Sequence, residues 1–276
     1  MAESKIKAEY LLSRINDMFK VVDISNPIKC ANNEKDAIQI HKTKNYDRVP
    51  IKDGNENIEK YYDSNENKTV PITPANLISE SSGILETLSY LSKKRFYFVL
   101  TGNKITRIVH YSDLNSPLVS LEIYSQIAYC EKAIRDYAIS NNMNETDEYR
   151  IKQVLTDINE NLTGKKNICI QQAEGRFNNK QTDDIETNLL DELNFDDELI
   201  LFRELSSRRD EDQAMKSIDM KLDDNTIESY KNLRNDIMHS KPIIKGKNDK
   251  INELIEFLKT CQEITLYIEM RLSDKT

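Results

Sequence analysis

The chain has 276 residues, of which 39 are Lys or Arg and 47 are Asp or Glu, giving a formal net charge of -8. Its four cysteines and three histidines exclude a zinc finger or zinc ribbon, because neither a Cys-x-x-Cys nor a His-x-x-x-His pair occurs. Its six glycines form neither a P-loop nor a G-x-G-x-x-G loop. We therefore expect no metal site, and an acidic chain is not expected to coat nucleic acid non-specifically.

The sequence shows no sign of a membrane or secretory segment. It opens with no charged-then-apolar leader, and its apolar runs stay below the roughly 18 residues of a membrane span. We expect the cysteines to be small, buried and reduced, as in a cytoplasmic protein, and the length fits two domains. The four cysteines are Cys30, Cys130, Cys169 and Cys261.

Residues 1–116 are predicted to mix helices and strands. Apolar residues at three- and four-residue steps predict a first helix over 4–22. The next unit is predicted as a helix over 34–42, a strand over 47–54 with an Asp-Gly turn, a strand over 57–63 and a polar loop over 64–68. The plan then repeats with an extended segment over 77–79, a helix over 82–92, a strand over 96–100, a turn over 101–103 and a strand over 105–110. This duplication predicts a pseudo-symmetric module whose halves bury their faces against each other.

Two sequence segments, "RVPIKDGNENIEKYYD" and "FYFVLTGNKITRIVHYSDL", each run strand, turn, strand and Asp. They resemble a tandem pair of cystathionine-β-synthase-type (CBS) motifs, which form a Bateman-type α/β module. In that family, clefts between the repeats bind adenosine-type nucleotides, and the Asp accepts hydrogen bonds from the ribose diol. The resemblance therefore implies an adenine-type nucleotide as a regulatory ligand.

Carried over to this sequence, the resemblance implies two ribose-binding carboxylates and two apolar residues that pack on the base: Asp63, Asp113, Ile58 and Ile108. The sequence departs from the family three places before each Asp, where a hydroxyl residue is usual and Lys60 and His110 stand instead. Lys60 is a candidate phosphate ligand, and His110 is a candidate specificity residue. The alternatives are that both Asp residues cap helices and that the module serves only for dimerisation.

Residues 117–276 are predicted to form an all-helical domain, with the domain boundary near Ser116. Helices are predicted over 118–140, 147–162, 195–205, 226–240 and 250–272, with an Asn-rich loop over 178–184. Asn194 is expected to cap the third helix. Asn225-Thr226-Ile227-Glu228 is close to a capping box for the fourth, which Pro242 ends.

The most informative motif is "RNDIMH", which contains Arg234, Asn235 and His239. It resembles the R-x(4–6)-H motif of HEPN domains. The segment "SLEIYSQIAYCEKAIRDYAI" resembles the first long helix of that family, with Glu131 and Arg135 in its Glu-x-x-x-Arg position. The whole chain is thus expected to be α+β, with a CBS pair over 1–116 followed by an all-α HEPN bundle over 117–276.

The HEPN resemblance implies a metal-independent endoribonuclease that leaves 2′,3′-cyclic phosphate ends. His239 would act as general base or general acid, Arg234 would hold the scissile phosphate, and Asn235 would orient it. Glu131 and Asp236 are candidate supporting residues. Family members pair, so we expect a homodimer or higher even oligomer and no catalytic cofactor. An acidic chain can still hold RNA here, because 229–250 carries six basic and two acidic residues, a net +4.

A toxic nuclease joined to a nucleotide sensor fits a toxin or antiviral system, with RNA as substrate and an antitoxin as a further partner. Three alternatives stay open. The chain could be a non-catalytic dimeric nucleotide-binding regulator with a HEPN-like docking bundle. The helical site could transfer nucleotides or be silenced by a partner. Finally, Arg234 and His239 could simply cap a solvated helix end.

Overall fold

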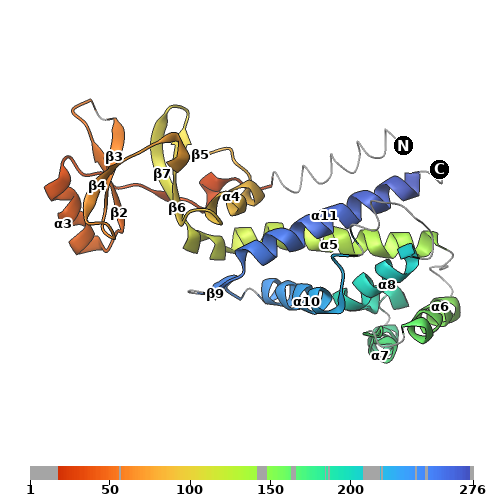
Figure 1. Cartoon of the computed structure of the whole chain (residues 1–276). Coiled ribbons are helices and arrows are strands. Elements are labelled where there is room, and N and C mark those ends of the chain that lie inside the picture. Colours follow the sequence, from red (N-terminus) through yellow and green to blue (C-terminus); the bar gives the residue numbers. More distant parts are fainter. Residues whose placement is uncertain are drawn as a thin grey trace. The chain divides into compact units, whose positions relative to one another are not determined.

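The computed structural model describes residues 18–273 except 56, 142–147, 163–165, 184, 186, 208–217, 219, 240 and 246–247. The described chain divides into two compact units: 18–122 with Ile243–Ile255, and Ile123–Pro242 with 256–273. The first unit, called the sheet unit below, holds the described strands, and the second, the helical unit, is built from helices (Figure 1). The predicted α+β class, with a sheet region before a helical region, is confirmed.

The start of the described chain differs from the expected helix over 4–22, most of which lies outside the described residues. Residues 18–20 are not helical, and a short helix α2 covers Val21–Ile24. Asp23 accounts for this start, because its carboxylate accepts a hydrogen bond from the Lys20 backbone N–H at 2.8 Å.

The first repeat contains α3 (Glu34–Lys44), β2 (Arg48–Lys52) and β3 (Ile58–Asp63), as predicted. Ala31 makes a parallel bridge to Ile51, and β2 pairs antiparallel with β3. A further strand, β4 (Lys68–Pro71), extends this sheet beside β3 and was not predicted. The polar stretch is therefore a tight turn over 64–67, and Lys68 already belongs to β4.

The second repeat contains β5 (Leu77–Ser79), α4 (Ile84–Leu91), β6 (Phe96–Thr101) and β7 (Lys104–His110), again as predicted. β5 runs parallel to β6, and β6 runs antiparallel to β7. Gly102 has a φ of 61° in the β6–β7 turn, a left-handed conformation that favours glycine. Three further short elements lie beside these repeats: β1 (Asn26–Pro27), which pairs with β7, and the 3-10 helices η1 (Pro74–Asn76) and η2 (Tyr111–Asn115).

The strand register corrects the predicted match between Asp63 and Asp113. Arg48 at the start of β2 lies opposite Asp63, just as Phe96 at the start of β6 lies opposite His110. The structural counterpart of Asp63 is thus His110, three residues before Asp113. Asp113 lies beyond β7, in η2.

The two repeats pack through one aromatic cluster. Tyr61 of β3 makes edge contacts with Phe96 and Phe98 of β6, with ring centroids 5.6 and 5.3 Å apart. Ile108 of β7 is buried in the same cluster. The two halves of the sheet unit therefore share a core, and each presents one face to the other.

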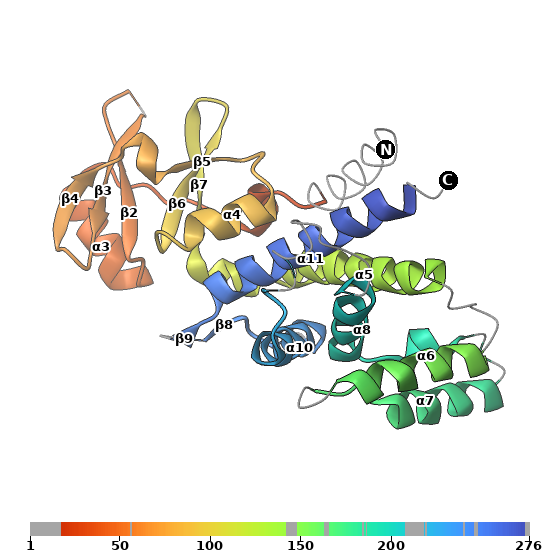
Figure 2. The same cartoon turned by 45° about the vertical axis from the view of Figure 1, so that its right-hand side comes forward.

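The helical unit contains α6 (Glu148–Asn161), α7 (Ile170–Thr182), η3 (Leu189–Glu192), α8 (Phe195–Ser207) and α10 (Asp224–Met238). It also holds most of α5 (Pro117–Ser140) and of α11 (Ile251–Ser273). The predicted boundary near Ser116 lies just before α5, whereas the division between the units follows Glu122, inside that helix. α5 and α11 lie side by side (Figures 1 and 2), and the Tyr129 hydroxyl donates a hydrogen bond to the Glu269 carboxylate at 3.0 Å. α8 packs on α10 and α6 on α7.

Three local predictions in the C-terminal half were wrong. The predicted loop over 178–184 falls on α7, a helix that was not predicted at all and that buries Ala173 and Phe177, so Asn178–Thr182 is helical. The N-cap of α10 is Asp223, whose carboxylate accepts a hydrogen bond from the Thr226 N–H at 2.7 Å, so Asn225 lies inside the helix. Two short strands, β8 (Ile244–Lys245) and β9 (Asn248–Asp249), pair between the fourth and fifth predicted helices, in a half where no strand was expected.

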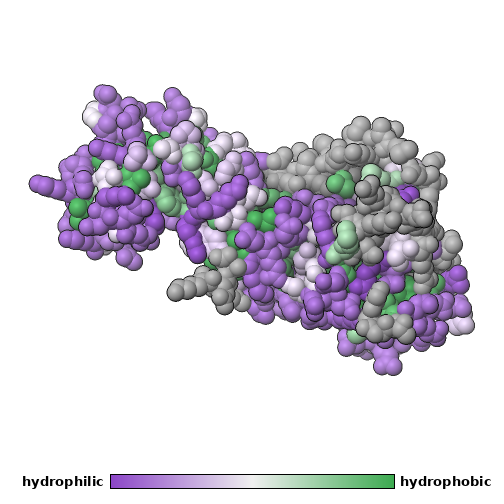
Figure 3. Space-filling view, in the orientation of Figure 1, coloured by the Kyte–Doolittle hydropathy of each residue, from purple (hydrophilic) through white to green (hydrophobic). Residues whose placement is uncertain are grey.

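Most of the described surface visible in Figure 3 is hydrophilic. Across the described residues, the large exposed apolar side chains come from separate stretches of the sequence: Met18, Tyr46, Leu121, Tyr149, Ile185, Met220 and Met238. None of the helices in the described part of the chain is long and apolar enough to cross a membrane.

Candidate functional site

The predicted catalytic Arg234 is held by the predicted supporting residue Glu131. α10 buries a stripe of Ile227, Tyr230, Leu233 and Ile237, which leaves Arg234 half-buried beside it. The Arg234 Nε donates to Glu131 Oε1 at 3.1 Å. Glu131 is a buried residue of α5, so the contact fixes a cationic side chain of one helix against a carboxylate of another.

A second ion pair lies next to this contact and was missed by the sequence analysis. The Arg135 Nη1 donates to Glu198 Oε1 at 2.6 Å, and the Arg135 Nε lies 3.3 Å from Asp191 Oδ1. Burial raises the pKa of Glu198 well above its ordinary value, and the nearby Glu131 carboxylate raises it further. Two arginines and two glutamates thus meet where α5, α8 and α10 converge. The only sequence signal for Glu198 was the unusual acidic start of an apolar helix.

His239 lies apart from Arg234 within one chain. It caps the C-terminal end of α10, where its backbone N–H donates to the Asn235 carbonyl at 3.0 Å, and its side chain is exposed. Five residues of helix separate the two side chains by about 7.5 Å along the axis and about 140° around it. One chain therefore presents the two predicted catalytic side chains in different directions.

The other two predicted residues of the motif have local partners. Asn235 is half-buried, and its Oδ1 lies at 3.5 Å from the Arg234 Nη1, the limit of a weak hydrogen bond. Asp236 makes an ion pair with the Lys241 Nζ at 3.1 Å. This pair joins the last turn of α10 to the segment that follows it, so Asp236 supports the helix end.

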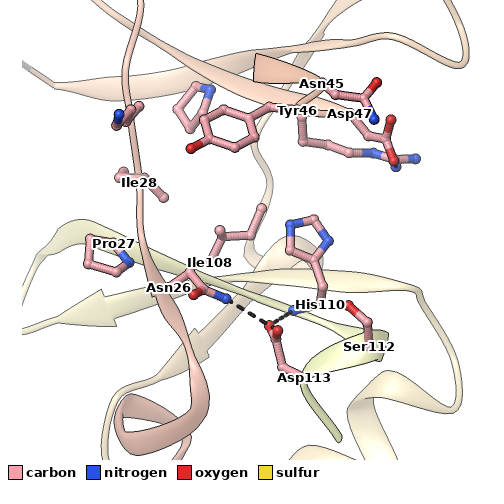
Figure 4. Close-up of a pocket in the computed structure, with 13 residues that line it drawn as sticks. Asn26, Pro27, Ile28, Asn45, Tyr46, Asp47, Ile108, His110, Ser112 and Asp113 are labelled. Carbon is pink, nitrogen blue, oxygen red and sulfur yellow. Dashed lines mark hydrogen bonds and ion pairs between the residues drawn. The ribbon is translucent and has the colours of Figure 1, made fainter. Parts of the chain in front are cut away.

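A pocket of about 540 Å³ opens in the sheet unit, between the two repeats. It is lined by three segments, 26–29, 45–50 and 108–113, as Figure 4 shows in close-up. Three of the predicted nucleotide-binding residues, Ile108, His110 and Asp113, come together here. The volume lies within the roughly 300–1,000 Å³ typical of small-molecule sites.

Asp113 is oriented by two hydrogen bonds at the pocket wall. The Asn26 Nδ2 donates to Asp113 Oδ1 at 3.2 Å, and the His110 backbone N–H donates to Oδ2 at 2.7 Å. Burial raises the pKa of Asp113, although the His110 N–H opposes that shift. Asp113 thus caps η2, as one alternative held, and also faces the pocket.

The ring of His110 lies against Phe96, with centroids 6.2 Å apart. Burial lowers the pKa of His110, so its side chain is uncharged at neutral pH. Arg48 lies over the same Phe96 ring at 4.9 Å and makes an ion pair with Asp63 at 3.3 Å. Arg48 is therefore already neutralised.

The predicted nucleotide site of the first repeat is not assembled. Asp63 is buried, where it accepts from Arg48 and from the Asn65 N–H at 2.9 Å. Ile58 lines a different pocket, of about 880 Å³, which does not include Asp63 or Lys60. The physical reason is the strand register, which points Asp63 at β2. Lys60 is exposed on β3.

Four pocket residues were not predicted. Asn26, Lys29 and Tyr46 belong to no motif, and Arg48 opens the first CBS-like segment but was assigned no role. All four are distant from 108–113 in the sequence. Within the described ranges, no group of three or more His, Cys, Asp or Glu side chains could hold a metal ion.

Comparison with known proteins found no family model and no curated protein that matches the chain. Membership of the CBS and HEPN families is therefore a proposal that rests on motifs and geometry.

Proposed function

We propose that the chain is a metal-independent, HEPN-type endoribonuclease whose activity is controlled by a nucleotide-class ligand in its CBS-like sheet unit. The observation that carries the proposal is the end of α10, where Glu131 holds Arg234 while His239 stays exposed. A fixed guanidinium suits a phosphate and an accessible imidazole can transfer protons near neutral pH, so the two groups suit metal-free cleavage of RNA.

In the proposed reaction, the RNA 2′-oxygen attacks the adjacent phosphorus and the 5′-oxygen leaves. His239 either takes the proton from the 2′-hydroxyl while water protonates the leaving 5′-oxygen, or protonates that oxygen while water takes the 2′-hydroxyl proton. Arg234 donates hydrogen bonds to the phosphate oxygens, where negative charge grows in the transition state. The products are a 2′,3′-cyclic phosphate and a 5′-hydroxyl.

The helix geometry favours an active site made by two chains. Since Arg234 and the C-cap His239 project about 140° apart at the end of α10, two copies of α10 that meet would each offer one of the side chains to a shared phosphate. A mixture of Arg234→Ala and His239→Ala proteins tests this point. Partial activity should return in the mixture, because a mixed dimer keeps one intact Arg234 and one intact His239. A mixture as inactive as its components argues against a shared site.

The proposed control has a specific physical basis inside the sheet unit. η2 carries Asp113 at the pocket and Asn115 two residues later. The Asn115 side-chain amide exchanges two hydrogen bonds with the Ile244 backbone, at 2.9 and 3.2 Å. Ile244 follows His239 by five residues, so a ligand that moves η2 acts on the segment that ends α10. Asn115→Ala should leave basal cleavage intact and abolish its response to ligand.

The test of the catalytic proposal compares RNA cleavage by wild-type protein, His239→Ala and Asn232→Ala. Asn232 is exposed on the same helix and serves as the matched control. His239→Ala should lose cleavage by 100-fold or more, on the order of a general acid–base contribution, while Asn232→Ala keeps it. Equal activity of all three proteins contradicts the proposal.

A non-catalytic nucleotide-binding regulator is the second candidate. The formed pocket and the commitment of Arg234 to Glu131 favour it. It predicts ligand binding without RNA cleavage under any ligand condition. It also predicts that expression of the intact gene does not stop growth, whereas the nuclease proposal predicts growth arrest that His239→Ala relieves.

A further inference from the structure

The charges around the 540 Å³ pocket are nearly balanced. Its lining holds two cations, Lys29 and Arg48, and two carboxylates, Asp47 and Asp113. Arg48 is committed to carboxylates, because its guanidinium lies 3.3 Å from Asp63 and 3.8 Å from Asp47. Among the described residues that line the pocket, Lys29 is the cation for which no ion pair occurs. Lys29 is therefore the lining cation that is available to pair with one negative charge of a ligand.

Tyr46 provides an aromatic surface at the pocket. Asn45 ends α3 in the left-handed conformation, with a φ of 56°, and the chain turns there so that Tyr46 follows at the pocket edge. The Tyr46 side chain is 40% exposed, which leaves its ring available. Figure 4 shows Tyr46 on the opposite wall from Asp113, with Ile108 between them. An aromatic ring opposite a carboxylate matches the two ends of a nucleoside.

Asp113 retains capacity for a ligand. A carboxylate offers about four acceptor positions, and the two hydrogen bonds from Asn26 and His110 use two of them. The remaining positions suit the two hydroxyls of a ribose. His110 beside it is neutral and adds no charge that would attract phosphates.

We propose that this pocket selects a nucleoside or a nucleoside monophosphate and discriminates against triphosphates. The base stacks on Tyr46, the ribose hydroxyls bind Asp113, and a single phosphate lies at Lys29. A triphosphate brings about four negative charges to a site with one uncommitted cation, and Asp47 and Asp113 repel the excess. The inference deepens the proposed nucleotide control and rests on it.

The test is calorimetric titration of the full chain with the adenosine and guanosine series, each as nucleoside, monophosphate and triphosphate. In the series that binds, the monophosphate should bind at least tenfold more tightly than the triphosphate. Lys29→Ala should lower monophosphate affinity to that of the nucleoside and leave the nucleoside unchanged. Lys35→Ala, which removes an exposed lysine of α3 outside the pocket, should change neither.

Variants of the aromatic wall complete the test. Tyr46→Ala should lower the affinity for the nucleoside and for the monophosphate alike by about tenfold. Tyr46→Phe should keep both affinities at the wild-type level, since a phenyl ring also stacks on a base. A triphosphate that binds as tightly as the monophosphate overturns the inference, as does a Lys29→Ala protein with unchanged monophosphate affinity. If no member of either series binds while RNA is still cleaved, both this inference and the nucleotide control fail. The ribonuclease proposal then stands alone.

Discussion

The contact between Glu131 and Arg234 should be measurable as a coupling energy within the helical unit. The perturbation is a double-mutant cycle of Glu131→Ala, Arg234→Ala and the combined variant. The two side chains are 10% and 26% exposed and meet at 3.1 Å. Exposed ion pairs contribute about 0.2–1 kcal/mol, whereas breaking a buried pair costs about 3–5 kcal/mol. The partial burial here places the expected coupling at about 1–2 kcal/mol.

The assay is urea unfolding of the four proteins, followed by circular dichroism. Removal of Glu131 also relieves its repulsion of Glu198, so the single Glu131→Ala variant should be destabilised less than Arg234→Ala. The control cycle uses Glu256 and Lys259 on α11, an exposed pair at 2.8 Å, for which we expect about 0.2–0.5 kcal/mol. If the Glu131 and Arg234 effects add to within about 0.3 kcal/mol, the contact does not fix Arg234 and the reasoning fails.

Three further predictions concern protonation and the backbone. Glu198 holds its proton more tightly in the folded than in the unfolded state, so its contribution to stability falls as pH rises above 4.5. The free energy of unfolding of the wild type, measured across pH, should therefore fall above pH 4.5 relative to that of Glu198→Gln. Two parallel curves would refute this. Because burial raises the pKa of Asp113, calorimetric affinity for the nucleoside should weaken as pH falls through that raised value. The Asp113→Asn protein should bind the nucleoside weakly at every pH. A wild-type affinity for the nucleoside that stays constant on acidification would count against ribose binding by Asp113. Gly102→Ala at φ 61° should lower the free energy of unfolding by about 1 kcal/mol, and an unchanged midpoint would show that the turn relaxes.

The regular elements could largely be predicted, because their signals are local. The dense β-formers of 96–100 and the Asp-Gly turn after β2 gave strands close to the observed ones. The apolar stripe of α10 gave that helix and its buried face. The whole of α7 was missed, because no helix was predicted between 162 and 195. Its end carries Asn178 and Asn179, whose weak helix propensity is overridden by the burial of Phe177.

The candidate sites were only partly predictable, because tertiary contacts decide them. Glu131 and Arg234 are 103 residues apart, and only the family resemblance brought them together. Asp63 and Asp113 end similar motifs, but the register pairs Asp63 with Arg48 and leaves Asp113 at the pocket. Tyr46 is part of no motif, so its place at the pocket could not be read from the sequence.

The most direct test of the central claim is the chemistry of the RNA ends. Purified wild-type protein is incubated with end-labelled RNA in excess EDTA, with and without the nucleoside or monophosphate that it binds. We expect 2′,3′-cyclic phosphate ends in EDTA. Their amount should depend on the ligand, and they should be absent with His239→Ala. Uncut RNA under every condition, or ends that persist in His239→Ala, would contradict it.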